Sequence, residues 1–292
     1  MPELPEVETV VRSLAPAVLR GRVLNVQRGE HDVTLPRGTD LRRRLVGRSI
    51  ASLARRAKRI VFTLDDGHRF FVHLGMTGQL RLHDPLDEIA KHTHVTLTLR
   101  TICGGGGQRE LRYVDPRRFG GLHWLGDAPA DTGLGPEPLT LPAAGLRQRL
   151  GRTRRGVKSA LLDQKLVAGL GNIYVDEALH AAGIHPLTPA DRVPADRVAA
   201  LSRATKRILR TAIDAGGSTL RDYVDADGNR GGFQHAHKVY GRPGAPCRRC
   251  RTPIVKSVIG GRGTHHCPAC QPEPAESESA GMTGRPAVAS GR

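Results

Sequence analysis

The N-terminal residues Pro2, Glu3 and Glu6 have the types and the spacing that nucleophilic catalysis on a sugar requires. Removal of Met1, which is usual before a small residue, would leave Pro2 with a free secondary amine. Because an α-amino group titrates at about 7.7–8.0, a good fraction of that amine is unprotonated near neutral pH. Such an amine can attack a sugar aldehyde carbon and form an iminium. Glu3 and Glu6, three residues apart on one helix face, would supply two carboxylates for proton transfer.

The same residues also fit a purely structural interpretation. Helices favour proline at their first position and acidic side chains in their first turn. Residues 1–8 show both features. Taken alone, this segment therefore leaves open whether it is a catalytic centre or an ordinary helix start.

Two Cys-x2-Cys pairs, sixteen residues apart, predict a metal site made of Cys247, Cys250, Cys267 and Cys270. Four thiolates suit tetrahedral Zn²⁺, and a site closed by four protein ligands is structural. Two disulfides are the poorer alternative for a protein that we expect to be intracellular. We therefore expect one structural zinc ion in a finger at 241–271, with Cys103 left outside it.

The charge of the chain indicates a nucleic-acid partner. Its 292 residues carry a formal net charge of +17, and the arginines and lysines cluster, as at 42–44, 55–59 and 152–155. A surplus of this kind points to a polyanion. No apolar run reaches transmembrane length, and the acidic N-terminus does not resemble a signal peptide. We expect a soluble, cytoplasmic monomer that binds DNA and no membrane.

The pattern along the chain predicts an α+β protein that positions these residues. Residues 3–20 have helical spacing of apolar side chains, and 22–125 show short β-rich runs punctuated by glycine, proline and aspartate. We expect an N-terminal helix plus an antiparallel β-sandwich in a domain at 1–133, with a linker at 134–150. A helical DNA-binding domain should follow at 151–240, with helices over 161–166, 172–182 and 195–215. The tail at 272–292 is predicted to be disordered.

Residues 161–174 read as a helix, two tight turns and a second helix. Gly169 and Gly171 would let a phosphate approach the backbone, and Asn172 could cap the second helix or donate to that phosphate. A glycine-containing corner in a core is the alternative. The basic stretch at 152–158, with Arg154 and Lys158, favours DNA binding instead.

Five segments occur in one order: Pro-Glu-Leu-Pro-Glu-Val-Glu-Thr at 2–9, His-Leu-Gly-Met-Thr-Gly at 73–78, Asp-Pro-Arg-Arg-Phe-Gly at 115–120, the segment 163–174 and the cysteine pairs. Together they make residues 2–271 resemble the formamidopyrimidine-DNA glycosylases. The resemblance implies a bifunctional enzyme of base excision repair. It would remove 8-oxoguanine and formamidopyrimidines from duplex DNA and then cut the strand by β,δ-elimination.

The resemblance also implies roles for single residues. Pro2 would attack C1′, Glu3 would protonate the opening sugar, Lys58 would assist β-elimination, and Arg262 in the finger would serve the δ step. The implied DNA contacts are His92, Arg117, Arg154, Asn172 and Arg221, the last on a loop at about 217–233 over the displaced base.

A base inside a duplex must be displaced before chemistry can reach it, and the space left behind needs filling. Met76, Arg117 and Phe119 are of types that can wedge between bases. Each has an ordinary alternative, because Met76 and Phe119 could belong to a core and Arg117 to an ion pair.

Two other functions remain open at this stage. An endonuclease VIII-like glycosylase would prefer oxidised pyrimidines, although Leu4 and the set at 76, 117 and 119 favour the purine branch. A zinc-finger protein that only senses damage would need no chemistry. The presence of Pro2, Glu3 and Lys58 together argues against it.

Overall fold

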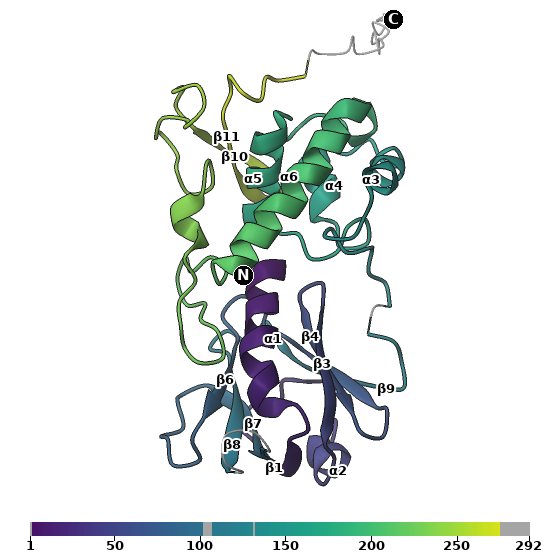
Figure 1. Cartoon of the computed structure of the whole chain (residues 1–292), viewed down its shortest axis with the longest axis vertical. Helices are drawn as coiled ribbons and strands as arrows, with labels where there is room; N and C mark the ends of the chain where they lie inside the picture. The colour runs from purple at the N-terminus through teal and green to yellow at the C-terminus, as the bar shows by residue number, and fades with distance from the viewer. Residues whose placement is uncertain (1, 102–106, 131, 275–292) are drawn as a thin grey trace, which may run out of the picture.

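The computed structural model describes residues 2–101, 107–130 and 132–274 of the chain. Figure 1 shows an elongated molecule with the β-sheets at one end and the helices and the finger at the other, joined along α1. Cys103, most of the glycine run at 104–107 and the tail at 275–292 lie outside the described residues. The prediction of a disordered tail therefore remains a prediction.

Helix α1 (Leu4–Val18) forms as the apolar spacing predicts, with Glu3 at its N-cap. A capping box closes its first turn, since the Glu6 carboxylate accepts the Glu3 N–H at 2.8 Å. The whole first turn of this helix is buried, and beyond it the buried side chains follow one stripe that ends near Val18. The stripe fixes α1 between the sheets and the helical domain, so that the N-terminus lies where the two meet (Figure 1).

The N-terminal domain contains two sheets, as predicted for a sandwich. The four-stranded sheet has the order β1-β7-β8-β6, made of β1 (Arg22–Arg28), β7 (Thr93–Arg100), β8 (Gln108–Val114) and β6 (Gln79–His83). The five-stranded sheet has the order β2-β9-β5-β4-β3, made of β2 (Thr34–Leu35), β9 (Gly121–Gly126), β5 (Arg69–His73), β4 (Arg59–Leu64) and β3 (Ile50–Arg56). All neighbouring strands are antiparallel except β2 and β9, which pair in parallel.

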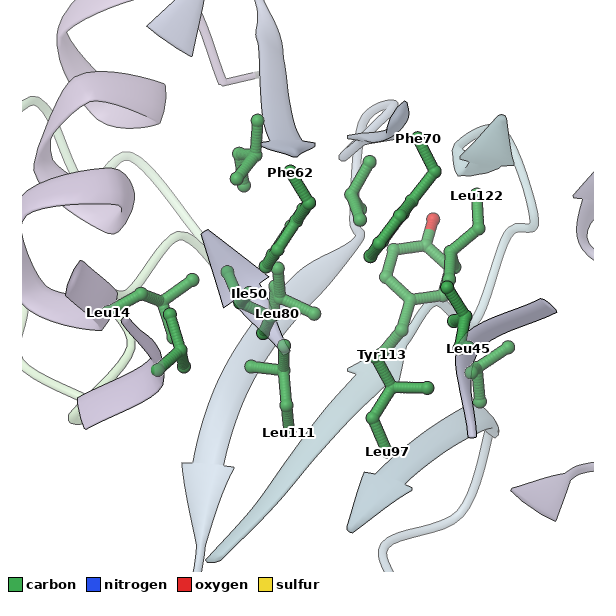
Figure 2. Packing of buried hydrophobic residues seen from close by; sticks show 14 of the residues in the cluster. Leu14, Leu45, Ile50, Phe62, Phe70, Leu80, Leu97, Leu111, Tyr113 and Leu122 are labelled. Carbon is green, nitrogen blue, oxygen red and sulfur yellow. The ribbon is translucent and has the colours of Figure 1, made fainter. Parts of the chain in front are cut away.

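One apolar core fills the space between the sheets (Figure 2). Phe62 and Phe70 stack at 4.6 Å between ring centroids and face side chains of the other sheet. Leu14 of α1 and Leu45 of α2 (Leu41–Leu45) close the sides of this core.

A second core holds the helical domain together. Its helices are α3 (Ala143–Leu150), α4 (Val157–Leu162), α5 (Asn172–Ala182) and α6 (Ala195–Asp214), with short 3₁₀ turns η1 (Ala190–Arg192) and η2 (Phe233–Ala236). Leu4 of α1 is buried in this same core, which ties the N-terminus to the helices.

Two sequence predictions need correction here. The helix expected at 161–166 lies at Val157–Leu162, because Asp163 ends it by accepting the Lys165 N–H at 2.9 Å in a turn. The linker expected at 134–150 includes α3, whose Leu146 and Leu150 are buried in the helical core. Among the described residues, no helix is long and apolar enough to cross a membrane.

Candidate active site

A pocket of about 380 Å³ opens where the two domains meet. It brings together side chains that are far apart in the sequence. The lining residues are Pro2, Glu6, Met76, Thr77, Arg117, Ile173, Ser218, Leu220, Arg221, Asp222, Tyr223 and Tyr240. Of the residues predicted for the site, Pro2, Glu6, Met76, Arg117 and Arg221 thus share one cavity.

Glu3 lies buried beside this pocket, against the N-terminus of α5. Its carboxylate accepts the Ile173 N–H at 2.9 Å and the Tyr174 N–H at 3.4 Å. The net pKa of Glu3 is raised to about 7. Burial makes the largest contribution and the charge of Glu6 adds to it, while the charge of Lys58 and the two N–H groups lower the pKa. A carboxyl group with this pKa can hold or release a proton near neutral pH, which suits general acid catalysis.

Gly169 and Gly171 serve a purpose different from the one we predicted. A Cβ on Gly171 would lie 2.3 Å from the Glu3 carboxyl carbon, and one on Gly169 would lie 2.9 Å from a Leu4 methyl group. The Leu4 N–H also donates to the Gly169 carbonyl at 3.1 Å. The two turns therefore let the start of α1 approach α5, whose first N–H groups donate to Glu3.

Glu6 also differs from its predicted role as a second proton-transfer group. One carboxylate oxygen accepts the Ser218 N–H at 2.7 Å and the Tyr174 hydroxyl, while the other accepts the Glu3 N–H. With both oxygens engaged, Glu6 fixes the catalytic segment to α5 and to the loop that starts at Ser218. Its geometry is that of a positioning residue.

Lys58 stands in the turn between β3 and β4 and is 8% exposed. Burial lowers the pKa of its ammonium group, and the positive charge of Arg262 lowers it further. The carboxylates of Glu3 and Glu6 act in the opposite direction. Lys58 is therefore close enough to Glu3, Glu6 and Arg262 for their charges to act on its ammonium group.

The turn that carries Lys58 is held by Glu137, which sequence reasoning missed. The Glu137 carboxylate accepts the Ala57 N–H at 2.6 Å and hydrogen bonds from Arg55 and Arg56 at 2.7 and 3.0 Å. Glu137 belongs to the segment between the domains, so this contact ties the linker to the active site. The Gly-Pro-Glu-Pro run at 135–138 was its only signal in the sequence.

Asp115 holds the loops of Met76 and Arg117 in place by hydrogen bonds, a role that the sequence analysis did not predict. Its fully buried carboxylate accepts the Thr77 hydroxyl at 2.6 Å, the Arg117 N–H at 3.2 Å and the Gly120 N–H at 3.0 Å. Burial alone would raise its pKa, but these hydrogen bonds lower it. One ionised group thus holds together the loop of Met76 and the loop of Arg117.

The three residues predicted to wedge between bases, Met76, Arg117 and Phe119, lie at the surface. Met76 is 45% exposed and Phe119 57% exposed, and the Arg117 guanidinium lies 4.5 Å from the centroid of the Phe119 ring. Neither Met76 nor Phe119 belongs to a core, and no ion pair to Arg117 is found among the described residues. The ordinary alternatives for these residues are therefore excluded.

The prediction that Lys158 contacts DNA is contradicted by its burial. Its side chain is 0% exposed, and its ammonium donates to Asp176 at 2.6 Å, Thr264 at 2.8 Å and the Gly263 carbonyl at 3.1 Å. Asn172 donates to the same carbonyl at 2.7 Å and does not cap the helix that it begins. The two residues hold the finger hairpin, β10 (Val255–Ile259) and β11 (Arg262–His266), against α5.

The remaining predicted DNA contacts lie at the surface. Arg262 at the start of β11 is exposed, and so are His92, Arg154 and Arg221. Arg154 is 95% exposed and 3.8 Å from Asp191. Glu177 accepts the N–H groups of residues 238–240 and so positions Tyr240 in the pocket, another contact that the sequence did not indicate.

The four predicted cysteine ligands converge as a zinc site requires. Their Sγ atoms all lie within 4.8 Å of one another, with separations of 3.9 Å for Cys247 and Cys270 and 3.4 Å for Cys250 and Cys267. A tetrahedron with Zn–S bonds of about 2.3 Å has S···S edges of about 3.8 Å. The thiols therefore fit one structural Zn²⁺ ion, and no open position for a substrate remains.

Loss of the zinc site should unfold the finger and weaken DNA binding while leaving both larger cores folded. The reason is that metal binding at such a site supplies the folding free energy of the finger. Cys267→Ser should therefore lose zinc, measured by elemental analysis, and raise the Kd for damaged duplex. Absence of zinc from the wild-type protein purified without chelator would contradict this.

Comparisons with known proteins agree with this geometry. The N-terminal domain model of formamidopyrimidine-DNA glycosylase matches residues 1–122, and the H2TH domain model of the same enzyme matches 134–224. A zinc finger model found in FPG and IleRS matches 244–272. The formamidopyrimidine-DNA glycosylase of Thermomicrobium roseum is 44% identical over 287 residues, which cover 93% of this chain and 99% of the relative. The chain belongs to the formamidopyrimidine-DNA glycosylase family.

Other members extend the likeness. The formamidopyrimidine-DNA glycosylase of Bacillus subtilis is 44% identical over 282 residues, covering 93% of this chain and 99% of that one. The crystal structure of the MutM protein from Thermus thermophilus superposes with a TM-score of 0.81 at 40% identity, covering 94% and 100% of the two chains. The structure of the Lactococcus lactis Fpg in complex with an abasic site containing DNA superposes with a TM-score of 0.84 at 34% sequence identity. The match covers 93% of this chain and 100% of that chain.

Proposed function

We propose that this protein removes oxidised purines from duplex DNA and then cleaves the strand at the abasic sugar. One observation carries the proposal: the buried Glu3 carboxyl, with its pKa raised to about 7, lies beside Pro2 at a pocket between the domains. The family relation supports the substrate class, because relatives have been solved with DNA that contains Fapy-dG or carbocyclic 8-oxo-G.

The chemistry starts at the free amine of Pro2. Its nitrogen attacks C1′ as the bond from C1′ to the base breaks, and the proton lost by the amine protonates the departing base. Glu3 then gives its proton to the ring oxygen, the C1′–O4′ bond breaks, and the opened sugar is left as an iminium on Pro2. The iminium that results acidifies the C2′ proton. Loss of that proton breaks the C3′–O bond, with Lys58 assisting, and the second elimination breaks the C5′–O bond, with Arg262 holding the phosphate.

The wedge and the basic surface prepare the substrate for this step. Met76, Arg117 and Phe119 fill the gap that the displaced base leaves, which offsets the cost of unstacking. His92, Arg154 and Arg262 are exposed cationic or neutral donors for the DNA backbone. Asn172, although it binds the finger, has a second amide N–H that a phosphate can accept. The enzyme would act in the cytoplasm, on chromosomal DNA.

Excision from matched duplexes tests the proposal. We expect release of 8-oxoguanine opposite cytosine to be faster than release of an oxidised pyrimidine from the same sequence. A preference for the pyrimidine would favour an endonuclease VIII-like enzyme instead. Binding of every duplex without excision, and without nicking of an abasic site, would identify a damage sensor and contradict the proposal.

A further inference from the structure

Helix α6 has two chemically different faces. Its buried side chains belong to the core of the helical domain. On the other side Arg203, Arg207 and Arg210 are exposed, and their spacing of four and then three residues places them on one face of the helix. Lys206 lies half-buried beside them. This surface, made of Arg203, Lys206, Arg207 and Arg210, is termed the basic face of α6.

Helix α3 lies beside α6 and adds to the positive charge there. Leu146 of α3 and Thr205 of α6 line one small cavity, so the two helices are neighbours at this point. Arg147 and Arg149 belong to α3, which contains no acidic residue. The acidic residues of α6 are confined to its two ends, at 196 and 214. The middle of this surface is therefore positive throughout.

The cations of the basic face have no partners within the described part of the chain. None of the four takes part in an ion pair there, and none of their side chains makes a hydrogen bond. By contrast, Arg155 lies 2.9 Å from Asp163, and Arg197 lies 3.9 Å from Asp196. Unpaired cations of like sign repel one another, and an anion that covers them relieves this repulsion.

The chemistry of this face suits the DNA backbone better than a protein partner. No large apolar side chain of α3 or α6 is exposed. Protein–protein interfaces have an apolar centre, whereas binding to the DNA backbone depends on charge. Arg203 and Arg210 are seven residues apart, which is about 10 Å along the helix axis. Duplex DNA carries one negative charge per about 1.7 Å of its axis, so the same length presents about six phosphates.

The basic face is turned away from the finger. Helix α5 is buried along nearly its whole length and packs against both α6 and strand β11 of the finger. Figure 1 shows α6 across the front of the helical domain, with α5 and the finger hairpin behind it. Arg262, the finger residue at the start of β11, therefore lies on the opposite side of α5 from the basic face. A duplex held by Arg262 and the active-site pocket leaves the basic face free.

We propose that the basic face of α6 binds the backbone of a second DNA duplex while the first duplex occupies the active-site pocket. The inference goes beyond the proposed excision, because it needs no chemistry at Pro2. A protein that holds two duplexes can release the first one while it stays bound to the second. Neighbouring DNA should therefore speed its transfer from one segment to the next.

The test uses the full-length protein, a short duplex with a stable abasic analogue and a donor dye, and an undamaged duplex with an acceptor dye. Each duplex is too short for two protein molecules. At low salt we expect energy transfer between the dyes, because one protein holds both duplexes. In Arg203→Gln/Arg207→Gln/Arg210→Gln the Kd for the second duplex should rise about tenfold or more, and the slope of log K against log salt should fall by about 3. The Kd for the abasic duplex should not change.

The matched control is Arg42→Gln/Arg43→Gln/Arg44→Gln. It removes the same number of exposed arginines from α2, at the far end of the N-terminal domain (Figure 1), and should keep the energy transfer. An equal loss in this control would show that net charge, and not the basic face, is responsible, and would overturn the proposal.

Three other outcomes would also overturn the proposal. They are no energy transfer with the wild-type protein, a sedimenting complex that contains two protein molecules, and weaker binding of the abasic duplex by the α6 variant. The last would place the basic face in the lesion-binding cleft. The replaced side chains are exposed, so both variants should keep the wild-type thermal unfolding curve. None of these measurements needs turnover, so a failure of the proposed excision activity would be seen separately.

Discussion

A chain with an uncleavable N-terminal tag should fold, bind zinc and bind damaged DNA, but release no base and cut no strand. The tag converts the Pro2 nitrogen into an amide, which is not nucleophilic and cannot form the iminium. Excision should fall below detection. Borohydride, which reduces an iminium to a stable amine, should trap a covalent adduct with DNA through residue 2 of the untagged protein and none with the tagged one.

A tag that a protease removes up to Pro2 is the matched control and should restore both activities. Pro2→Gly keeps a terminal amine, so it should retain part of the strand cleavage. Full activity and trapping with the blocked chain would show that another amine is the nucleophile. Lys58 would be the first candidate, because Glu3 acts on its ammonium group, whereas the ammonium group of Lys158 is paired with Asp176.

Glu3→Gln should reduce base excision by about 10²–10⁴-fold, the usual worth of general acid catalysis. Strand cleavage at a preformed abasic site should fall less, because no base has to leave. In the wild-type protein the proton of Glu3 is lost as pH rises through about 7. Excision limited by this acid should then decline by about tenfold per pH unit above that value, and the variant should show no such decline.

The same substitution should change the pH dependence of stability. Burial raises the pKa of Glu3 from 4.5 to about 7 in the folded state. The contribution that protonation of Glu3 makes to folding stability is therefore fully present below pH 4.5 and is lost as pH rises through about 7. A shift of this size corresponds to about 3 kcal/mol. Thermal unfolding should therefore show Glu3→Gln gaining stability over wild type between these two pH values.

Glu30→Gln replaces an exposed carboxyl of the same domain and should leave both the pH profile of excision and the unfolding curve unchanged. A wild-type excision rate that stays constant from pH 6 to pH 9 would contradict the assignment of Glu3 as the acid. A decline that persists in Glu3→Gln would assign the titration to another group.

Local patterns in the sequence were enough to predict the features that depend only on residues close together in the chain. The spacing of Cys247, Cys250, Cys267 and Cys270 predicted the finger, because two short turns suffice to bring each pair together. The apolar stripe of residues 4–18 predicted α1, since helix periodicity is a local property. The run of motifs that includes Pro2 and Glu3 predicted the family, which the comparisons confirmed.

The tertiary structure alone decided what each polar group near the site does. The basic stretch at 152–158 predicted that Lys158 contacts DNA, but its ammonium group is buried against Asp176, eighteen residues away. The glycines of the two turns read as phosphate contacts, but they make room for Glu3, which is far away in the sequence. Asp115 counted in the sequence only as part of the segment 115–120, and Glu137 gave almost no signal. Charge pattern reports how many ionic groups a segment has, whereas their roles depend on burial and on partners that long-range packing supplies.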